Sequence, residues 1–427
     1  MTGRSKRFEG RRCTMAIELV LRTGRAHQLA AFALILFWVY SGVSVSFAKN
    51  ANSTSQDKTS QDKKGQTGNS KTTDKVNTQA ANSTQDKTNA KKEKRGSFVI
   101  APIPISSPAF GSGLILITAY VFKLDTDDNV SPPSWVGLAG AYTNNGSRGL
   151  ASGAKLYMKE NKYQTTFAFI TGRANLDFFG IGRIPGKDPI SVPLSIHGKI
   201  FFGELMRDVR NIFIGPRFQY RRLSTGIDGG ISPPGGFVIP EIDLKSTSAA
   251  LGFHVQRDRR NSTFYPTSGT LFDFTGDFFD QAWGSRREYQ TYKVAFNGFR
   301  QMADKQVFAY RAMACSANGS VPFYDLCLYG FNSDLRGYTT GEFQNRRMFA
   351  SQAEYRFELP KRLGLVAFAG VGGVAGRWGD FRSDQLLPAA GVGLRFKLDK
   401  KNHINYRIDF AYGREGHTLS IGVGEAF

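Results

Sequence analysis

Arg336 is the residue whose type and setting most clearly suggest a specific electrostatic role. It lies in the tetrapeptide Leu335-Arg336-Gly337-Tyr338, at the end of the stretch VPFYDLCLYGFNSDLRGY (321–338). A guanidinium presents a planar fork of N–H donors that matches a carboxylate. Glu354 stands on the polar side of the next alternating segment and is a candidate carboxylate partner for Arg336.

Patterns that would indicate catalysis are missing from the sequence. The histidines that follow residue 48 show no paired spacing of the kind that binds a metal; they are His197, His254, His403 and His417. There is no Gly-x-Ser-x-Gly nucleophile elbow and no glycine-rich phosphate loop that ends in Lys-Ser/Thr. We therefore expect no enzyme activity, no metal and no cofactor.

Alternation of apolar and polar residues predicts the elements that position Arg336 and Glu354. In 349–359, 392–398 and 404–412, aromatic and aliphatic side chains occupy one face and mostly polar or charged ones the other; the charges are of both signs in 349–359 and 404–412 and positive in 392–398. No segment after residue 50 has the roughly 18 continuous apolar residues of a membrane-spanning helix. The alternation of apolar and polar residues is typical of transmembrane β-strands, which place one face against lipid and the other toward the barrel interior, the lumen. The predicted fold is all-β, a transmembrane antiparallel β-barrel.

The N-terminal part of the chain differs from the rest in composition. Residues 1–48 contain basic residues, an apolar core at 29–40 and small residues at Ser46 and Ala48, which predicts a signal peptide; Met15 is an alternative start. Residues 49–97 are polar and of low complexity, which predicts a disordered periplasmic linker. The barrel is expected to occupy 98–427.

The net charge of +21 does not indicate nucleic-acid binding. About half of the excess lies before residue 98, and the remainder is interspersed with acidic residues along the predicted barrel. A nucleic-acid-binding surface would instead concentrate its basic residues in one patch or stripe. We expect no nucleic-acid partner.

The stretch 321–338, together with the alternating strands after it and the final Phe427, resembles the outer-membrane assembly-factor superfamily, the BamA/TamA-like barrels or bacterial surface antigens. The resemblance implies sixteen strands and a long outer loop folded into the lumen, where Arg336 meets acidic residues of the wall. Phe368 and Gly370 occupy a position where many relatives have Phe-x-Asp-x-Gly, so half of the acidic clasp is expected to be absent. The resemblance then leaves two alternatives: Glu354 pairs with Arg336 with help from Glu358, or the loop is held more loosely. No folded periplasmic (POTRA) domain is recognisable before the barrel.

Further motifs support the same resemblance. Asp258, Arg260 and Asn261, followed by Pro266 and Gly269, resemble the family's periplasmic turn, in which proline and glycine fit a tight bend. If this turn faces the periplasm, strands at 269–279, 286–300 and 305–317 are the ninth to eleventh, and the Arg336 loop lies at the outer end.

Later strands are expected at 346–359, 363–376, 387–398, 404–412 and 417–427. Only seven are clear before residue 258, so an eighth is expected within 172–193 or 226–239. Phe427 resembles the C-terminal signal that the barrel-assembly machinery recognises, with Glu425 interrupting the apolar face near the membrane interface.

Cys315 and Cys327 bracket a short segment beside the loop. In an oxidising compartment they would form a disulfide or remain two free thiols, and the sequence does not decide between these alternatives.

The resemblance implies an integral protein of the bacterial outer membrane that inserts or translocates protein or lipid. Its partners would be outer-membrane lipid and, during biogenesis, the barrel-assembly machinery; the sequence does not identify protein clients. The alternative is a passive channel or structural barrel with a plugging loop, and an outer-membrane lipid hydrolase is less favoured.

Overall fold

The structure is a computed structural model that describes residues 96–107, 111–186, 191–227, 245–331, 333–399 and 403–427. The predicted signal peptide and nearly all of the predicted linker lie outside these residues. Within the described part, no helix has the length and apolar character needed to cross a membrane.

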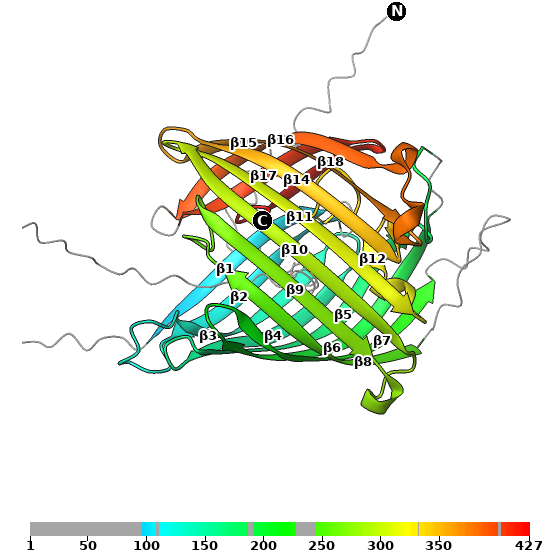
Figure 1. The fold of residues 1–427 in the computed structure, drawn as a ribbon, viewed down its shortest axis with the longest axis horizontal. Helices are drawn as coiled ribbons and strands as arrows, with labels where there is room; N and C mark the ends of the chain where they lie inside the picture. Colours follow the sequence, from blue (N-terminus) through cyan, green and yellow to red (C-terminus); the bar gives the residue numbers. More distant parts are fainter. Residues whose placement is uncertain (1–95, 108–110, 187–190, 228–244, 332, 400–402) are drawn as a thin grey trace, which may run out of the picture.

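Sixteen strands of the described chain form one closed antiparallel barrel, which confirms the predicted fold class (Figure 1). Around the barrel each strand pairs with its neighbours in the chain, and the last strand meets the first. The strands are β1 (Gly96–Ser107), β2 (Gly111–Phe122), β3 (Ser134–Thr143), β4 (Arg148–Met158), β5 (Tyr163–Phe178), β6 (Val192–Asp208), β7 (Phe213–Ile227), β8 (Lys245–Asp258), β9 (Gly269–Phe279), β10 (Tyr289–Ala303), β11 (Gln306–Gly319), β14 (Arg347–Glu358), β15 (Leu363–Ala375), β16 (Leu387–Asp399), β17 (Ile404–Gly413) and β18 (Gly416–Val423).

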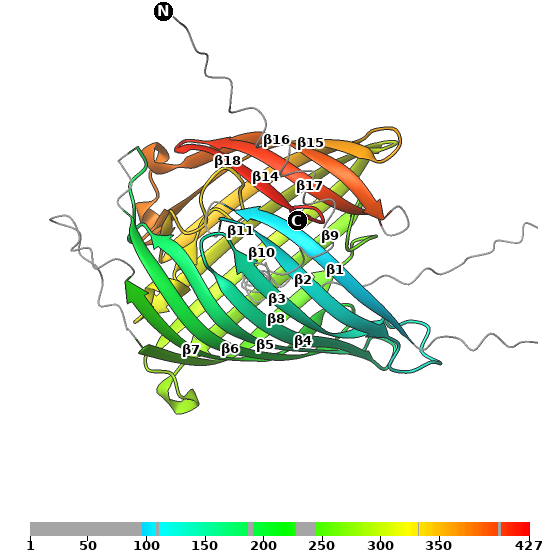
Figure 2. The same cartoon turned by 180° about the vertical axis from the view of Figure 1, so that it is seen from behind.

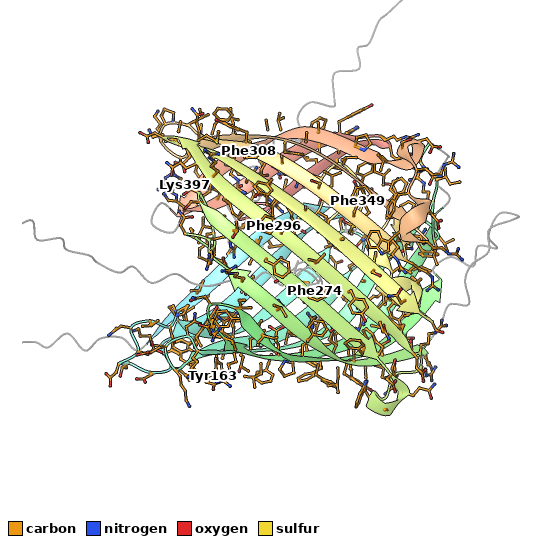
Figure 3. The ribbon with its side chains drawn as sticks, in the orientation of Figure 1. Tyr163, Phe274, Phe296, Phe308, Phe349 and Lys397 are labelled. Atoms are coloured by element: carbon orange, nitrogen blue, oxygen red, sulfur yellow. A yellow bond between two sulfur atoms is a disulfide. The ribbon has the colours of Figure 1, made fainter. Side chains whose placement is uncertain are left out.

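Side chains alternate between the two faces of the barrel wall as the alternation of apolar and polar residues in the sequence predicts. On β14, Gln352, Glu354 and Arg356 are buried in the interior, whereas Phe357 is exposed on the outside. Aromatic rings such as Phe296 and Phe308 project from the outer surface of β10 and β11 (Figure 3). Successive side chains of a strand point to opposite faces, so a polar residue between two apolar ones must face the lumen.

The predicted positions of the strands after residue 258 agree with the structure to within a few residues at most ends, but two details were wrong. The eighth strand of the first half is not a separate segment within 172–193 or 226–239: the described parts of these ranges contain only ends of β5, β6 and β7 and the β5–β6 connection. These three strands are long, and their ends extend into the ranges where a strand of their own was expected. The last strand ends at Val423 rather than continuing to Phe427.

The connection from β11 to β14 (320–346) is long and folds into the lumen. It contains a two-stranded sheet of β12 (Cys327–Leu328) and β13 (Gln344–Asn345). Strand order places this loop at the opposite end of the barrel from the β8–β9 turn, as predicted. Barrels of this strand number are too wide for wall side chains alone to fill. The loop therefore supplies much of the interior packing.

The junction between β1 and β18 is much shorter than the other interstrand ladders (Figure 2). Ser106 opposite Ile421 is the single registered pair between these two strands in the described residues. The shortest of the other ladders, β3 with β4 and β17 with β18, have eight registered pairs each. We call the β1–β18 junction the seam.

Candidate functional site: a loop bound inside the barrel

Arg336 lies inside the barrel, with its side chain fully buried. Nη2 donates to Oε2 of Glu354 on β14 at 2.5 Å, and Nη1 donates to Oδ2 of Asp409 on β17 at 2.9 Å. Nε donates to Oε1 of Gln352 at 3.1 Å, and the guanidinium stacks 3.5 Å above the ring of Phe368. Two carboxylates, an amide and an aromatic face therefore compensate the loss of water around the charge.

The second carboxylate comes from a strand that the sequence did not single out. Gly370 replaces the aspartate of the family pattern, but Asp409 on β17 supplies the missing acid. A Cβ at Gly370 would lie 2.4 Å from Cδ1 of Leu335 and 2.3 Å from the Ser351 carbonyl oxygen, so the loop occupies the space of a side chain there. The expected help from Glu358 was wrong, because this carboxylate pairs with Lys397 at 3.1 Å.

The ion pairs continue beyond Arg336. Arg356 donates through Nε to Oε1 of Glu354 at 2.6 Å. Arg395 on β16 donates to Asp409 at 2.5 Å and to Glu425 at 2.8 Å. We call these residues the lumen charge cluster: Arg336, Glu354, Arg356, Arg395, Arg407, Asp409 and Glu425. For all members except Arg336 and Glu425, the alternation along the strands predicts that the side chain points into the lumen. The alternation does not predict which of these side chains pair with one another.

The chain end also joins this cluster, which corrects the sequence prediction. Gly424 has φ of +86°, and after it the chain leaves the strand and enters the lumen. Glu425 thereby pairs with Arg395 and accepts from Nδ2 of Asn405 at 2.7 Å, instead of interrupting a lipid-facing surface. Phe427 is buried beside Phe299, and its main-chain oxygen accepts from Arg356 at 3.1 Å. Continued as a strand, the chain would have placed the Glu425 carboxylate on the outer face.

The other residues of the tetrapeptide fix the loop against β16. Gly337 has φ of +117°, and a Cβ there would lie 2.9 Å from that of Ala389, so both its conformation and its closeness favour glycine. The Tyr338 hydroxyl donates to the Pro388 carbonyl oxygen at 2.6 Å. Burial raises the pKa of Tyr338 to about 12, which keeps this hydroxyl a donor. Leu335 and Tyr338 belong to a buried apolar cluster with Cys315, Ala317, Cys327, Tyr329, Phe343, Met348, Ala350, Leu387 and Ala389.

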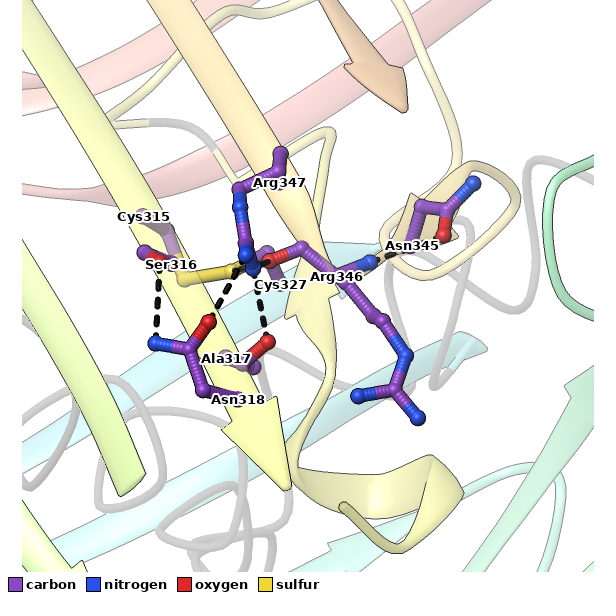
Figure 4. Close-up of a disulfide and its surroundings, with 8 residues drawn as sticks. All are labelled: Cys315, Ser316, Ala317, Asn318, Cys327, Asn345, Arg346 and Arg347. Carbon is purple, nitrogen blue, oxygen red and sulfur yellow. Dashed lines mark hydrogen bonds between the residues drawn. A yellow bond between two sulfur atoms is a disulfide. The ribbon is translucent and has the colours of Figure 1, made fainter. Parts of the chain in front are cut away.

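The beginning of the loop has its own attachments. Asp325 accepts two hydrogen bonds from Arg221 on β7, at 2.5 and 2.9 Å, and a third from the Tyr289 hydroxyl at 2.5 Å. Cys315 on β11 and Cys327 in the loop are joined by a disulfide in the structure (Figure 4). The loop is thus held by covalent, ionic and apolar contacts to strands on different sides of the barrel.

The residues of the predicted turn motif form one compact turn between β8 and β9. Asp258 accepts from the backbone N–H and the guanidinium of Arg260, and Asn261 Oδ1 accepts from the backbone of Thr267 at 3.0 Å. Gly269 has φ of +98° and no room for a side chain beside the carbonyl oxygen of Arg259. The Pro266 carbonyl oxygen lies 3.4 Å from Nη1 of Arg356, so this turn borders the lumen charge cluster.

No group of three or more metal-ligating side chains occurs in the described part of the chain. The site consists of arginine–carboxylate pairs beside the short seam.

A closed antiparallel barrel whose outer surface is apolar and whose lumen holds an inward loop defines a transmembrane β-barrel protein. The model of the Omp85 superfamily domain matches residues 210–427, about half of the chain, and the chain belongs to that superfamily.

Solved structures of similar fold include BamA from Haemophilus ducreyi lacking POTRA domains 1–3, with 15% identity and a TM-score of 0.51 over 78% of this chain and 70% of that one. CdiB from Acinetobacter baumannii has 12% identity and a TM-score of 0.51 over 77% of this chain and 60% of that one. CdiB from Escherichia coli has 12% identity and a TM-score of 0.52 over 78% and 62%. At these identities the likeness concerns the fold alone, and no curated protein matches the chain.

Proposed function

We propose that this protein is an outer-membrane barrel that inserts or translocates protein or lipid, and that it acts through its seam rather than through bond chemistry. The observation that supports this proposal is the single registered pair between β1 and β18. Membership of the Omp85 superfamily supports the location and the general role.

The free edge of β1 provides the physical basis. All twelve residues of β1 are registered with β2, but among the described residues Gly96–Ile105 have no registered partner on the seam side. At about 3.3 Å per residue, this edge is about 30 Å long and comparable to the hydrocarbon thickness of a bilayer. Each unsatisfied backbone group costs several kcal/mol in lipid, so an incoming strand that pairs there lowers the energy of both partners.

Two prolines reduce the number of N–H donors along this edge. Pro102 and Pro104 lie two residues apart in β1, so their nitrogens point to the same side. Proline is tolerated in a strand where its nitrogen faces an open edge, and we therefore infer that both proline nitrogens point toward the seam. In the register of Ser106 with Ile421, Pro104 stands opposite Val423, the last residue of β18, and offers it a carbonyl acceptor but no donor, while Pro102 lies beyond the end of β18. The missing donor and the early end of β18 together favour a weak seam over a complete ladder.

Membrane lipid on the outer wall and an extended client strand at the seam are the partners that fit this role, with the barrel-assembly machinery acting on the chain during its own biogenesis. The second candidate is a passive barrel plugged by its loop. The observation that favours it is the firm attachment of the loop at Asp325, Arg336 and the Cys315–Cys327 bridge.

Locking the seam separates the two candidates. Cysteines introduced by Ser106→Cys and Ile421→Cys stand opposite each other and should crosslink on oxidation. The oxidised double variant should lose its ability to accelerate the folding of a small barrel protein into liposomes and regain it on reduction. Each single variant, and the wild type with reductant, serve as controls. Unchanged acceleration by the locked barrel would contradict the proposal, and planar-bilayer conductance insensitive to the lock would support the passive barrel.

A further inference from the structure

The carboxylate side-chain oxygens of the lumen charge cluster are all engaged by N–H donors. Glu354 is shared by Arg336 and Arg356, and Asp409 is shared by Arg336 and Arg395. Glu425 accepts from Arg395 and from Asn405. The fourth arginine, Arg407, makes none of these pairs.

Arg407 is nevertheless buried, with a relative exposure of 8%. Its Nε and Nη1 have no acceptor among the described residues, and the same holds for Nη2 of Arg395. The two arginines face each other in register on β17 and β16. Like charges directly opposite each other destabilise a sheet, and buried N–H donors without acceptors add a further cost. An anion between them would remove both penalties.

The position of Arg407 connects this spot with the seam. Its Nε and Nη2 lie 3.2 and 3.5 Å from the place where a Cβ of Gly422 would stand, so the guanidinium lies against the lumen side of β18. Gly422 directly follows Ile421, the seam partner of Ser106. A group that passes the seam from the membrane therefore meets Arg407 early on the interior side.

We propose that Arg407, with the free N–H of Arg395, forms a phosphate-binding site inside the barrel beside the seam. Phosphate fits because its several oxygens can accept from two guanidinium groups at once, and arginine is suited to such bidentate contacts. The phosphate is that of a lipid headgroup or of the free anion. The binding site follows from the contacts of Arg407 and Arg395 alone, whereas its use by a lipid rests on the proposed function.

Thermal unfolding of the full chain in a nonionic detergent tests the site. Sodium phosphate should raise the unfolding midpoint of the wild type above that in sodium chloride of equal ionic strength, and Arg407→Gln should abolish this rise. In chloride, Arg407→Gln should unfold at the same temperature as the wild type or higher, because the variant removes buried guanidinium N–H donors that have no acceptor among the described residues. If Arg407 served only to stabilise the fold, Arg407→Gln would instead unfold at a lower temperature than the wild type in chloride.

Two further variants complete the test. Arg382→Gln is the matched control, since Arg382 pairs with Asp384 at an exposed position and this variant should keep the full phosphate response. Arg407→Lys keeps the charge without the fork and should keep a reduced response, which provides a folded comparison if Arg407→Gln does not assemble. A wild type without a phosphate response, or an equal response in Arg407→Gln, would overturn the proposal.

Native mass spectrometry distinguishes the two sources of phosphate. Protein extracted from vesicles of phosphatidylcholine with phosphatidylglycerol should retain phosphatidylglycerol in the wild type and less of it in Arg407→Gln. Retention supports a headgroup, and a phosphate response without retention supports a site for the free anion. A phosphate response in a protein that does not accelerate client insertion would leave the site in place and contradict the proposed function.

Discussion

Removal of the Arg336 side chain is the most direct test of the lumen charge cluster. In Arg336→Ala, the contacts to Glu354, Asp409 and Gln352 are lost together with the stacking on Phe368. The loop keeps its attachments at Asp325 and at the disulfide. We therefore expect a barrel that still assembles, with a loop that is released at the end nearest β14 and β17.

The structure sets the size of this effect. Breaking a buried ion pair typically costs about 3–5 kcal/mol, because one charge stays behind without a partner. Here Glu354 retains Arg356 and Asp409 retains Arg395, so the cost should fall near the lower limit, about 3 kcal/mol. Arg336→Lys should cost less than Arg336→Ala but should not be neutral, since an ammonium cannot contact both carboxylates as a planar fork does.

The two carboxylates should differ in importance. Glu354→Gln removes the one side-chain carboxylate that Arg356 contacts among the described residues, and leaves it the main-chain oxygens of Pro266 and Phe427. Asp409→Asn leaves Arg395 with Glu425. Glu354→Gln should therefore destabilise the barrel more than Asp409→Asn does.

Heat-modifiability on semi-native gels and proteolysis of 320–346 measure these effects in the assembled protein. The double variant Arg336→Ala/Glu354→Gln should be less destabilised than the sum of the single variants, with a coupling energy of about 1–3 kcal/mol. Strict additivity would show that the two residues do not interact. Full heat resistance of Arg336→Ala would refute the reasoning for the whole cluster.

Three further results are expected. Glu425→Gln should lower the heat resistance of the barrel and make the chain end accessible to carboxypeptidase, because Arg395 loses one of its two carboxylates. Burial raises the pKa of the Asp334 carboxyl in the loop, so the folded state holds this proton more tightly than the unfolded state. The stability of the loop should therefore fall as the pH rises from the ordinary carboxyl pKa to the raised one. Asp334→Asn should flatten this part of the pH dependence when loop proteolysis is measured over a pH series. Cys315 and Cys327 should appear as one linked peptide pair in non-reducing mass spectrometry, and alkylation of either thiol without prior reduction would contradict the bond.

The alternation of residue types was sufficient to predict the barrel and the direction of most lumen side chains. Glu354, Arg356, Arg395 and Asp409 all lie on the polar side of an alternating segment, and all four are buried in the interior. This success has a simple cause: the pleat fixes which face a residue occupies once the strand is identified. The strand positions after residue 258 were predictable because each apolar run there is bounded by a turn.

Partners across the lumen could not be predicted in the same way. Asp409 reaches Arg336 because a loop from between β11 and β14 extends across the interior to β17, and no sequence period records that distance. The chain end was misjudged because Leu419, Ile421 and Val423 keep the strand pattern up to Gly424. The one available signal was the acidic Glu425 at a position that would face lipid, and it marks the residue after which the chain turns inward.

The lumen charge cluster joins the loop to the seam by an unbroken series of contacts. Glu354 on β14 contacts Arg336 of the loop, and Arg336 contacts Asp409 on β17. Asp409 contacts Arg395, and Arg395 contacts Glu425 just beyond the last strand. Both the loop and the chain end thus share the same few charges, and a movement of either changes the number of partners left for the other. Because each member is buried, a lost partner is costly, so the loop and the chain end should be held or released together.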